Sequence, residues 1–357
     1  MSKFYNNFIR PLLFKLSPET AHEIGIEFMK LGLAAWAAPA GDAADFGQIE
    51  RFGLKFKSPL GMAAGFDKNG VVVDQLGALG FGFVEVGTVT FDPQKGNEKP
   101  RLFRLPEDKA LINRLGFNND GTARVVERLK SIKRTIVVGI NIGRNKDVPN
   151  EEAVENYLKS FELAVEAADY VAVNISSPNT PGLRELQKAE NLEELLSALQ
   201  KRNKELSGKP LLVKIAPDVT ESDIEAVVNI CMRLEISGII ATNTTIGRDG
   251  LSTGRELVDS VGAGGLSGKP LQKRSDEVIS KIYKYSGGKL PVIGVGGVFT
   301  AEDAFDKIAA GACLVQAYTG FVYGGPSFAA DINSGLVRIL KEKSFATIDE
   351  AVGSALS

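Results

Sequence analysis

The sequence predicts a closed (β/α)8 barrel, known as a TIM barrel, preceded by a small helical extension. From about residue 50 onward, short apolar strands alternate with longer helical stretches, and there are eight such strands. Eight βα units over roughly 290 residues are what a closed barrel needs. A doubly wound open sheet with the same alternation is the alternative. We therefore expect two parts, a helical segment over residues 1–48 and a barrel over residues 49–357.

The extension should contain a helix that begins at Ser17-Pro18-Glu19. These residues combine an N-cap, a proline at the first helical position and an acid in the first turn. Charges interrupt the extension, so it is too short and too charged to span a bilayer. Two interpretations stay open, a helical pair packed on the barrel and a surface that lies on a membrane. The apolar residues expected on this helix are Ala21, Ile24, Phe28, Leu31 and Ala35, with Leu33 and Trp36 enlarging the surface.

The eight βα units follow from apolar, β-branched runs separated by amphipathic stretches. The predicted strands are 60–64, 83–89, 136–142, 170–175, 211–215, 238–242, 291–295 and 313–317. The predicted helices are 70–80, 120–131, 151–168, 190–206, 220–235, 270–286, 301–310 and 326–342. The connection over 91–119 is unusually long, and long loops at the mouth of a barrel are usually functional.

The composition of the chain argues against several kinds of partner and active site. A net charge of -2 over 357 residues gives no basic field for a phosphate backbone, so we expect no nucleic-acid partner. The only histidine, His22, lies in the extension, which argues against Ser-His-Asp hydrolysis and His-ligated zinc in the barrel. Cys231 and Cys313 are far apart and outside any metal-binding spacing, which indicates the cytosolic side and no metal site.

The carboxyl ends of the predicted strands carry carboxamides, hydroxyls, glycines and two lysines. The clearest case is 170–183, where a buried strand ends in Asn174, Ser176, Ser177, Asn179 and Thr180. Parallel α/β folds place their chemistry at this edge. Turn formation alone is the competing explanation for a bare SSPN segment. Apart from Asp67, carboxylates are absent from these ends, so a magnesium site or a pair of glycosidase carboxylates is poorly supported.

The last two strand ends, GVGG over 294–297 and YTGF over 318–321, predict a phosphate site, which Gly268 helps to form. A phosphate at the rim and a planar polar site over the mouth fit flavin mononucleotide (FMN). Lys214 should point toward that ring and stabilise its anionic reduced form. Pairing with a barrel carboxylate is the less favoured alternative, because the Lys214 strand end offers none. Lys68 suits a substrate carboxylate, and a solvated loop charge is its alternative.

With these strand ends the chain resembles the dihydroorotate dehydrogenase family over essentially its whole length. The segments in family order are AAGFDKNG, GNEKPRLFRLPEDKALINRLGFNN, VNISSPNTPGLR, VKIAPD, IATNTT, GGLSGKPL, IGVGG and GACLVQAYTG. The soluble members carry a cysteine base in the loop after strand four, whereas this loop has Ser177. The resemblance therefore implies the membrane-associated, quinone-reducing class.

The resemblance implies oxidation of (S)-dihydroorotate to orotate, the fourth step of pyrimidine biosynthesis, with FMN as hydride acceptor. Ser177 is the implied general base at C5, with a relay through Thr180 or a bound water. The implied orotate contacts are Lys68, Asn113, Arg114, Leu115, Gly116, Phe117, Asn174, Asn179, Asn243 and Thr244. The implied FMN contacts are Ala64, Gly65, Phe66, Asp67, Lys68, Thr88, Asn141, Asn174, Lys214, Thr242, Gly268, Gly297, Tyr318 and Thr319.

The resemblance also implies that ubiquinone or menaquinone enters through the amino-terminal helices, past His22 and Arg104. For His22, a satisfied structural histidine is an equal alternative. The implied protein is a monomer attached peripherally to the cytoplasmic face of the membrane. Two other functions stay open, another flavin barrel that reduces a pyrimidine or a uridine in RNA, and a non-catalytic barrel that binds membrane surfaces.

Overall fold

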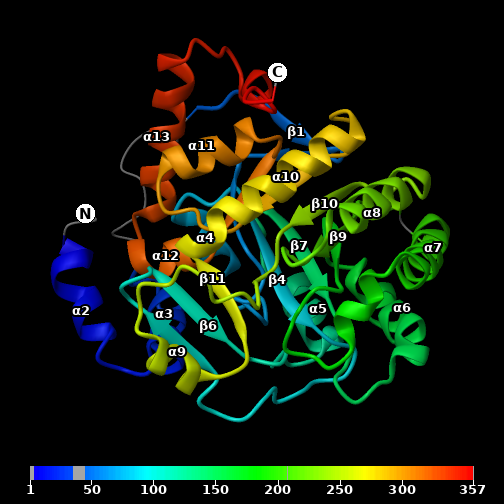
Figure 1. The fold of residues 1–357 in the computed structure, drawn as a ribbon, viewed down its shortest axis with the longest axis horizontal. Coiled ribbons are helices and arrows are strands. Elements are labelled where there is room, and N and C mark those ends of the chain that lie inside the picture. Colours follow the sequence, from blue (N-terminus) through cyan, green and yellow to red (C-terminus); the bar gives the residue numbers. More distant parts are fainter. Residues whose placement is uncertain (1–3, 35–44, 207, 357) are drawn as a thin grey trace.

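The computed structural model describes residues 4–34, 45–206 and 208–356, and these form a closed barrel of eight parallel strands (Figure 1). Each strand pairs with its neighbours in chain order, and β13 pairs with β3 to close the ring. The predicted closed barrel is thus confirmed, and the open sheet is excluded. The barrel strands are β3 (Leu60–Met62), β4 (Phe83–Val89), β7 (Val137–Ile142), β8 (Tyr170–Asn174), β9 (Leu211–Ile215), β10 (Gly238–Ala241), β12 (Val292–Val295) and β13 (Leu314–Ala317).

Helices surround the barrel between successive strands, and each predicted helix is found within a few residues of its predicted ends (Figure 1). The helices that connect the strands are α4 (Val73–Ala78), α5 (Thr122–Ser131), α6 (Ala153–Ala164), α7 (Ala189–Leu206), α8 (Glu221–Arg233), α10 (Gln272–Ser286), α11 (Ala301–Ala309) and α13 (Phe328–Glu342). The shorter helical segments are η3 (Asn150–Glu152), η4 (Leu183–Gln187), α9 (Arg255–Val261), η5 (Lys269–Leu271), α12 (Thr319–Gly324) and α14 (Ile348–Ala351).

The barrel strands are apolar because both of their faces are covered. Every residue of β4, β7, β8 and β9 is buried, as a parallel sheet packed between helices and a filled interior requires. Glycine makes room for large rings on neighbouring strands. A Cβ atom at Gly61 would lie 2.4 Å from the Phe83 ring, and one at Gly139 would lie 2.1 Å from the Tyr170 ring.

A small antiparallel sheet forms from the two long loops that follow β4 and β10. It contains β5 (Leu102–Leu105), β6 (Ala110–Asn113) and β11 (Gly265–Gly268), in the order β11-β6-β5. The long 91–119 connection therefore carries a hairpin that we did not predict from the sequence. Figure 1 shows β6 and β11 in front of the barrel strands, on the same side as α9. The sheet thus contributes walls to the cavity described below.

The chain before the barrel is helical, with η1 (Tyr5–Ile9), α2 (Arg10–Leu13) and α3 (Pro18–Lys30). The Ser17 side chain accepts a hydrogen bond from the Thr20 amide, which confirms the predicted N-cap. Leu31 is the C-cap of α3, so the helix ends sooner than its apolar spacing predicted. Ala35 and Trp36 lie outside the described residues. A two-stranded hairpin, β1 (Ile49–Arg51) and β2 (Leu54–Phe56), leads into the barrel.

The amino-terminal helices are attached to the barrel by polar contacts. Arg101 Nη2 lies 2.7 Å from Glu19 Oε1, and Arg104 Nη1 donates to the Leu16 carbonyl at 2.8 Å. The Tyr5 hydroxyl donates to the Val322 carbonyl at 3.0 Å. Among the described residues, no helix combines the length and the apolar composition that crossing a bilayer requires.

Candidate active site

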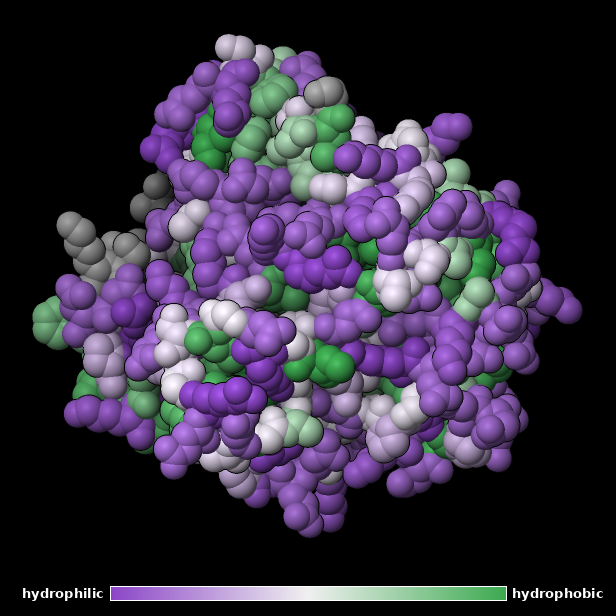
Figure 2. All heavy atoms as spheres, viewed as in Figure 1, coloured by the Kyte–Doolittle hydropathy of each residue, from purple (hydrophilic) through white to green (hydrophobic). Residues whose placement is uncertain are grey.

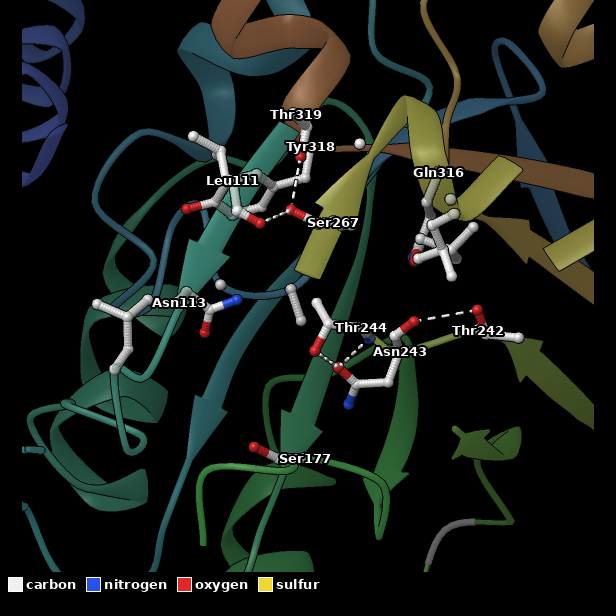
Figure 3. Close-up of a pocket in the computed structure, with 18 of the residues that line it drawn as sticks. Leu111, Asn113, Ser177, Thr242, Asn243, Thr244, Ser267, Gln316, Tyr318 and Thr319 are labelled. Atoms are coloured by element: carbon white, nitrogen blue, oxygen red, sulfur yellow. Dashed lines mark hydrogen bonds between the residues drawn. The ribbon is translucent and has the colours of Figure 1, made fainter. Parts of the chain in front are cut away.

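A cavity lies at the carboxyl ends of the barrel strands, where the sequence predicted a site. Its wall contains residues at or after the carboxyl ends of all the barrel strands except β7, together with residues of β6 and β11. Figure 3 shows Ser177 and Asn113 on two sides of it, with Ser267, Thr319 and Gln316 on the others. The predicted site residues that line it are Ala64, Gly65, Lys68, Thr88, Asn113, Leu115, Gly116, Phe117, Asn174, Ser177, Asn179, Lys214, Thr242, Asn243, Thr244, Gly268, Gly297, Tyr318 and Thr319.

Carboxamides from neighbouring strands form a hydrogen-bonded row along one side of the cavity. Asn174 Nδ2 donates to Thr88 Oγ1 at 2.9 Å, and Asn243 Nδ2 donates to Asn174 Oδ1 at 3.2 Å. The Thr244 amide in turn donates to Asn243 Oδ1 at 2.8 Å, one of the bonds drawn in Figure 3. Because their positions are fixed by these bonds, the side chains can present donors and acceptors to a flat heterocycle without rearrangement.

Ser177 lies in the loop after β8 and is buried. Its Oγ accepts a hydrogen bond from the backbone N–H of Asn179 at 3.3 Å. The side-chain Nδ2 of Asn179 donates to Asn113 Oδ1 at 3.0 Å. Within the described parts of the chain, the Ser177 hydroxyl has no carboxylate or imidazole partner. The buried Thr180 hydroxyl likewise has no hydrogen-bonding partner among the described residues and does not line the cavity.

Lys68 lines this cavity and also a smaller one beside α3, where Glu19 and Glu23 lie. Burial lowers the pKa of its ammonium to about 8, and the nearby Arg101 charge acts in the same direction, while Glu19 opposes both. The environment of Lys68 is therefore not that of a solvated loop charge. A cation in this position can attract a small anion in the cavity.

Lys214 is paired with a barrel carboxylate, the arrangement that the sequence analysis considered less favoured. Its Nζ lies 3.5 Å from Glu85 Oε1, and both side chains are buried. Glu85 lies within β4, away from the strand ends at which the sequence predicts site residues. Gln316 of β13 was also missed. Both residues could have been recognised from the sequence, since each is a polar residue within an otherwise apolar strand.

The predicted phosphate side of the cavity contains Gly297 after β12, Thr319 after β13 and Gly268 at the end of β11. Ser267 Oγ and Thr319 Oγ1 are 2.8 Å apart and join β11 to the start of α12 (Figure 3). Gly268 and Gly297 both have positive φ angles, 104° and 73°, which glycine adopts without strain. These loops can therefore bring backbone close to a ligand.

Four predicted contact residues do not line this cavity. Asn141 lies behind it and accepts a hydrogen bond from Thr88 Oγ1 at 2.5 Å. Asp67 accepts the backbone amides of Val71 and Val72, so its carboxylate stabilises a turn.

The other two are turned toward other parts of the molecule. The Arg114 guanidinium donates to the Ala263 carbonyl at 3.2 Å and stacks 4.5 Å from the centre of the Phe103 ring. Phe66 faces a second cavity, which the amino-terminal helices cover.

This second cavity has a volume of about 410 Å³ and a mostly apolar lining. It shares Leu102, Leu111 and Tyr318 with the first cavity, so these three residues form the wall between the two. Both predicted tunnel residues line it. The residues contributed by η1, α2 and α3 are Tyr5, Ile9, Leu13, Pro18, Ala21, His22, Ile24, Gly25, Phe28 and Met29.

His22 and Arg104, the two basic side chains among the described residues that line the apolar cavity, each pack against an aromatic ring. His22 packs edge-on against Phe66, with 5.0 Å between ring centres. Burial lowers the pKa of His22 to about 3, and the Lys68 charge adds to this effect, so its imidazole is neutral near pH 7. The Arg104 guanidinium lies 4.5 Å from the centre of the Phe14 ring. The guanidinium can donate a hydrogen bond to a carbonyl oxygen in the cavity, whereas the single N–H of the neutral His22 imidazole is directed at the Phe66 backbone.

Comparison with known proteins gives a consistent result. The family model described as dihydroorotate dehydrogenase matches residues 48–340. A relative named dihydroorotate dehydrogenase (quinone) from Christiangramia forsetii is 50% identical over 341 residues, covering 93% of this chain and 98% of the relative. The protein of the same name from Corynebacterium efficiens is 48% identical over 354 residues, covering 96% and 92%. A crystal structure of an Eimeria tenella DHODH with ferulenol has a TM-score of 0.86 at 35% identity, covering 94% and 95%.

Proposed function

Since this chain belongs to the dihydroorotate dehydrogenase family and is an oxidoreductase of the quinone-dependent type, we propose that it oxidises dihydroorotate with FMN as the first electron acceptor and a membrane quinone as the second. The proposal rests on one observation above all: a polar cavity with a row of carboxamides and a serine adjoins an apolar cavity through a shared wall. The two cavities suit a polar substrate and an apolar one.

The polar cavity fits a flavin. Gln316 Oε1 is buried in its wall without a hydrogen-bonding partner among the described residues, so it is an acceptor that a ligand N–H can satisfy. The Lys214 ammonium is the matching donor. The glycines after β12 and β13 lie where barrels hold a phosphate. When bound, FMN supplies the hydride chemistry that no side chain of the cavity can provide.

We assign to Ser177 the role of the base that accepts the proton from C5 of dihydroorotate. Its hydroxyl is buried, and the Asn179 amide holds the oxygen in position at 3.3 Å. Since no stronger base contacts it within the described residues, its activity must come from its position against the substrate and from the exclusion of water. The onward relay of the proton is assigned to the buried Thr180 hydroxyl, which has no other partner among the described residues, or to a bound water molecule.

Orotate and dihydroorotate carry N–H and C=O groups and a carboxylate, which match the functional groups around the cavity. Asn113, Asn179 and Asn243 supply carboxamides from three different loops. Leaving such groups unpaired rejects analogues that lack the matching edges. Lys68 supplies the charge that attracts the carboxylate.

The pH dependence of orotate binding tests the role assigned to Lys68. Because the pKa of Lys68 is about 8, the ammonium is present below that pH and is lost above it. We expect the dissociation constant of orotate to be constant below about pH 8 and to rise toward tenfold per pH unit above it. Titration of flavin absorbance with orotate measures this constant. Lys68→Arg stays charged throughout and should show no such rise, and a rise of the same size in that variant would contradict the assignment.

The apolar cavity and the outer surface beside it fit a quinone and a membrane. Of the thirteen exposed large hydrophobic side chains in the part of the chain that the structure describes, eight lie within residues 4–33, in the amino-terminal helices and their turns. Apolar atoms appear at the left edge of Figure 2, over this part of the chain. Ile24 and Phe28 belong to both the cavity lining and this exposed group, so the cavity reaches the apolar surface. We propose that this surface attaches the protein peripherally to the membrane.

The choice of electron acceptor tests the proposal. Purified protein should turn over dihydroorotate with a short-chain ubiquinone or menaquinone analogue in detergent. Replacing the quinone with fumarate or NAD should reduce turnover to background. Turnover with fumarate or NAD at the quinone rate would contradict the proposed use of the apolar cavity.

A further inference from the structure

Glu85 is a wholly buried carboxylate at the centre of the barrel, and side chains from four other strands converge on it. Its Oε1 accepts from Asn141 Nδ2 at 2.8 Å and lies 3.5 Å from Lys214 Nζ. Its Oε2 accepts from Gln316 Nε2 at 2.9 Å and from the Tyr170 hydroxyl at 3.1 Å. Four donors fill the capacity of one carboxylate.

The partners of Glu85 identify its charged form. The ammonium of Lys214 and the amide NH2 groups of Asn141 and Gln316 can only donate, so they satisfy a carboxylate and leave no place for an acidic proton. Burial and the Glu85 charge raise the pKa of Tyr170 well above its usual value, so its hydroxyl keeps its proton and can donate it to Glu85 Oε2. A buried charge is costly unless it is paired and hydrogen-bonded, and Glu85 has both kinds of partner.

Glu85 does not line the polar cavity, but its partners do. Lys214 and Gln316 reach the cavity directly. Asn141 reaches it through Thr88 and Asn174, which bond to Asn141 Oδ1 at 2.5 and 3.3 Å. Because the carboxylate binds the NH2 group of Gln316, the carbonyl oxygen Oε1 is left over as the partnerless acceptor.

We propose that Glu85 is a positioning residue that tunes the cofactor: its carboxylate neutralises Lys214 and fixes which group Gln316 presents to the ring. The cofactor named here rests on the proposed function. The titratable groups near the pair are Tyr170, which bonds to Glu85, and Lys68 and Tyr318, which line the same cavity as Lys214, while the other hydrogen-bonding partners of Glu85 are neutral amides. In Glu85→Gln the negative charge disappears while the Lys214 charge remains. Adding electrons to the flavin then becomes more favourable, because a cation stays without its counter-ion.

The test is the reduction potential of the bound flavin in Glu85→Gln, compared with that of the unsubstituted protein in the same buffer. We expect the equilibrium to shift at least tenfold toward the reduced flavin, which is about 30 mV for two electrons. In a Lys214→Gln background the same substitution should have a smaller effect, because no unpaired cation is then left beside the flavin. Asp276→Asn is the matched control, since it removes the partner of the buried Lys307, 2.7 Å away, outside both cavities.

An unchanged potential in Glu85→Gln with flavin retained, or an equal shift in the Lys214→Gln background, would overturn the proposal. Thermal unfolding of the four proteins as purified gives a second measure that needs no substrate. The two single variants should each lose more stability than the double variant, because each leaves one buried group unpaired. Additive losses would overturn the pairing. A protein without flavin would refute the proposed function, while this unfolding cycle would still decide the pairing.

Discussion

Replacing Ser177 with alanine is expected to slow reduction of the flavin by dihydroorotate by a factor of about 10² or more, the usual contribution of a positioned general base. The methyl group cannot accept the C5 proton, and within the described residues no other base contacts that position. Flavin content should not change, because the carboxamide row and the glycine loops are intact. Anaerobic stopped-flow absorbance of the flavin, with dihydroorotate as the only substrate, measures this step.

Ser177→Cys is the matched variant for this experiment. It keeps a proton acceptor of similar size at the same backbone position, so its rate should lie above that of Ser177→Ala. Orotate should bind both variants within a few-fold of the unsubstituted protein, because the Asn and Lys68 contacts remain. Flavin reduction in Ser177→Ala at the original rate would remove Ser177 from the role of base.

The second large effect is expected from Gly25→Phe, which is designed to fill the apolar cavity. Gly25 lies within α3 and lines this cavity, and a Cβ atom added there would meet no atom within 4 Å. A phenyl ring can therefore enter the 410 Å³ space without displacing the protein. Turnover with quinone should fall about tenfold or more, because a built-in clash excludes the ligand. Reduction of the flavin by dihydroorotate should stay within about twofold, since the polar cavity is untouched.

Gly25→Ala is the control, since it adds one methyl group and removes the conformational freedom of glycine from a helix. It should be as active as the unsubstituted protein and more stable by up to roughly 1 kcal/mol. Thermal unfolding of both variants shows whether α3 stays folded. Equal losses of flavin reduction and quinone turnover in Gly25→Phe would mean that the cavity supports the fold and does not bind the quinone.

The barrel could be predicted because its signals are local. Each strand is a continuous apolar run, and burial on both faces of a parallel sheet leaves that pattern in the sequence. The end of α3 was harder to predict, because apolar residues continue past Lys30 into the exposed turn that follows the helix. The β6–β11 pairing was missed because it joins loops that are far apart in the sequence, whereas β5 and β6 form a local hairpin within the 91–119 connection.

The candidate site could be predicted where a side chain follows directly from its strand end, as for Asn174 and Ser177. It could not be predicted where neighbours in sequence face different ways. Asn113 lines the cavity whereas Arg114 turns away to bind the backbone near Ala263. The contacts of Glu85 could be identified only from the closed barrel, because its partners come from four other strands.

The most direct test of the central claim is a two-step anaerobic mixing experiment with the purified protein. Dihydroorotate alone should bleach the flavin absorption, and a quinone analogue added afterwards should restore it. This result requires a polar substrate site and a separate acceptor site that communicate through one cofactor. A protein without flavin absorption, or a flavin that dihydroorotate leaves oxidised, would contradict the account.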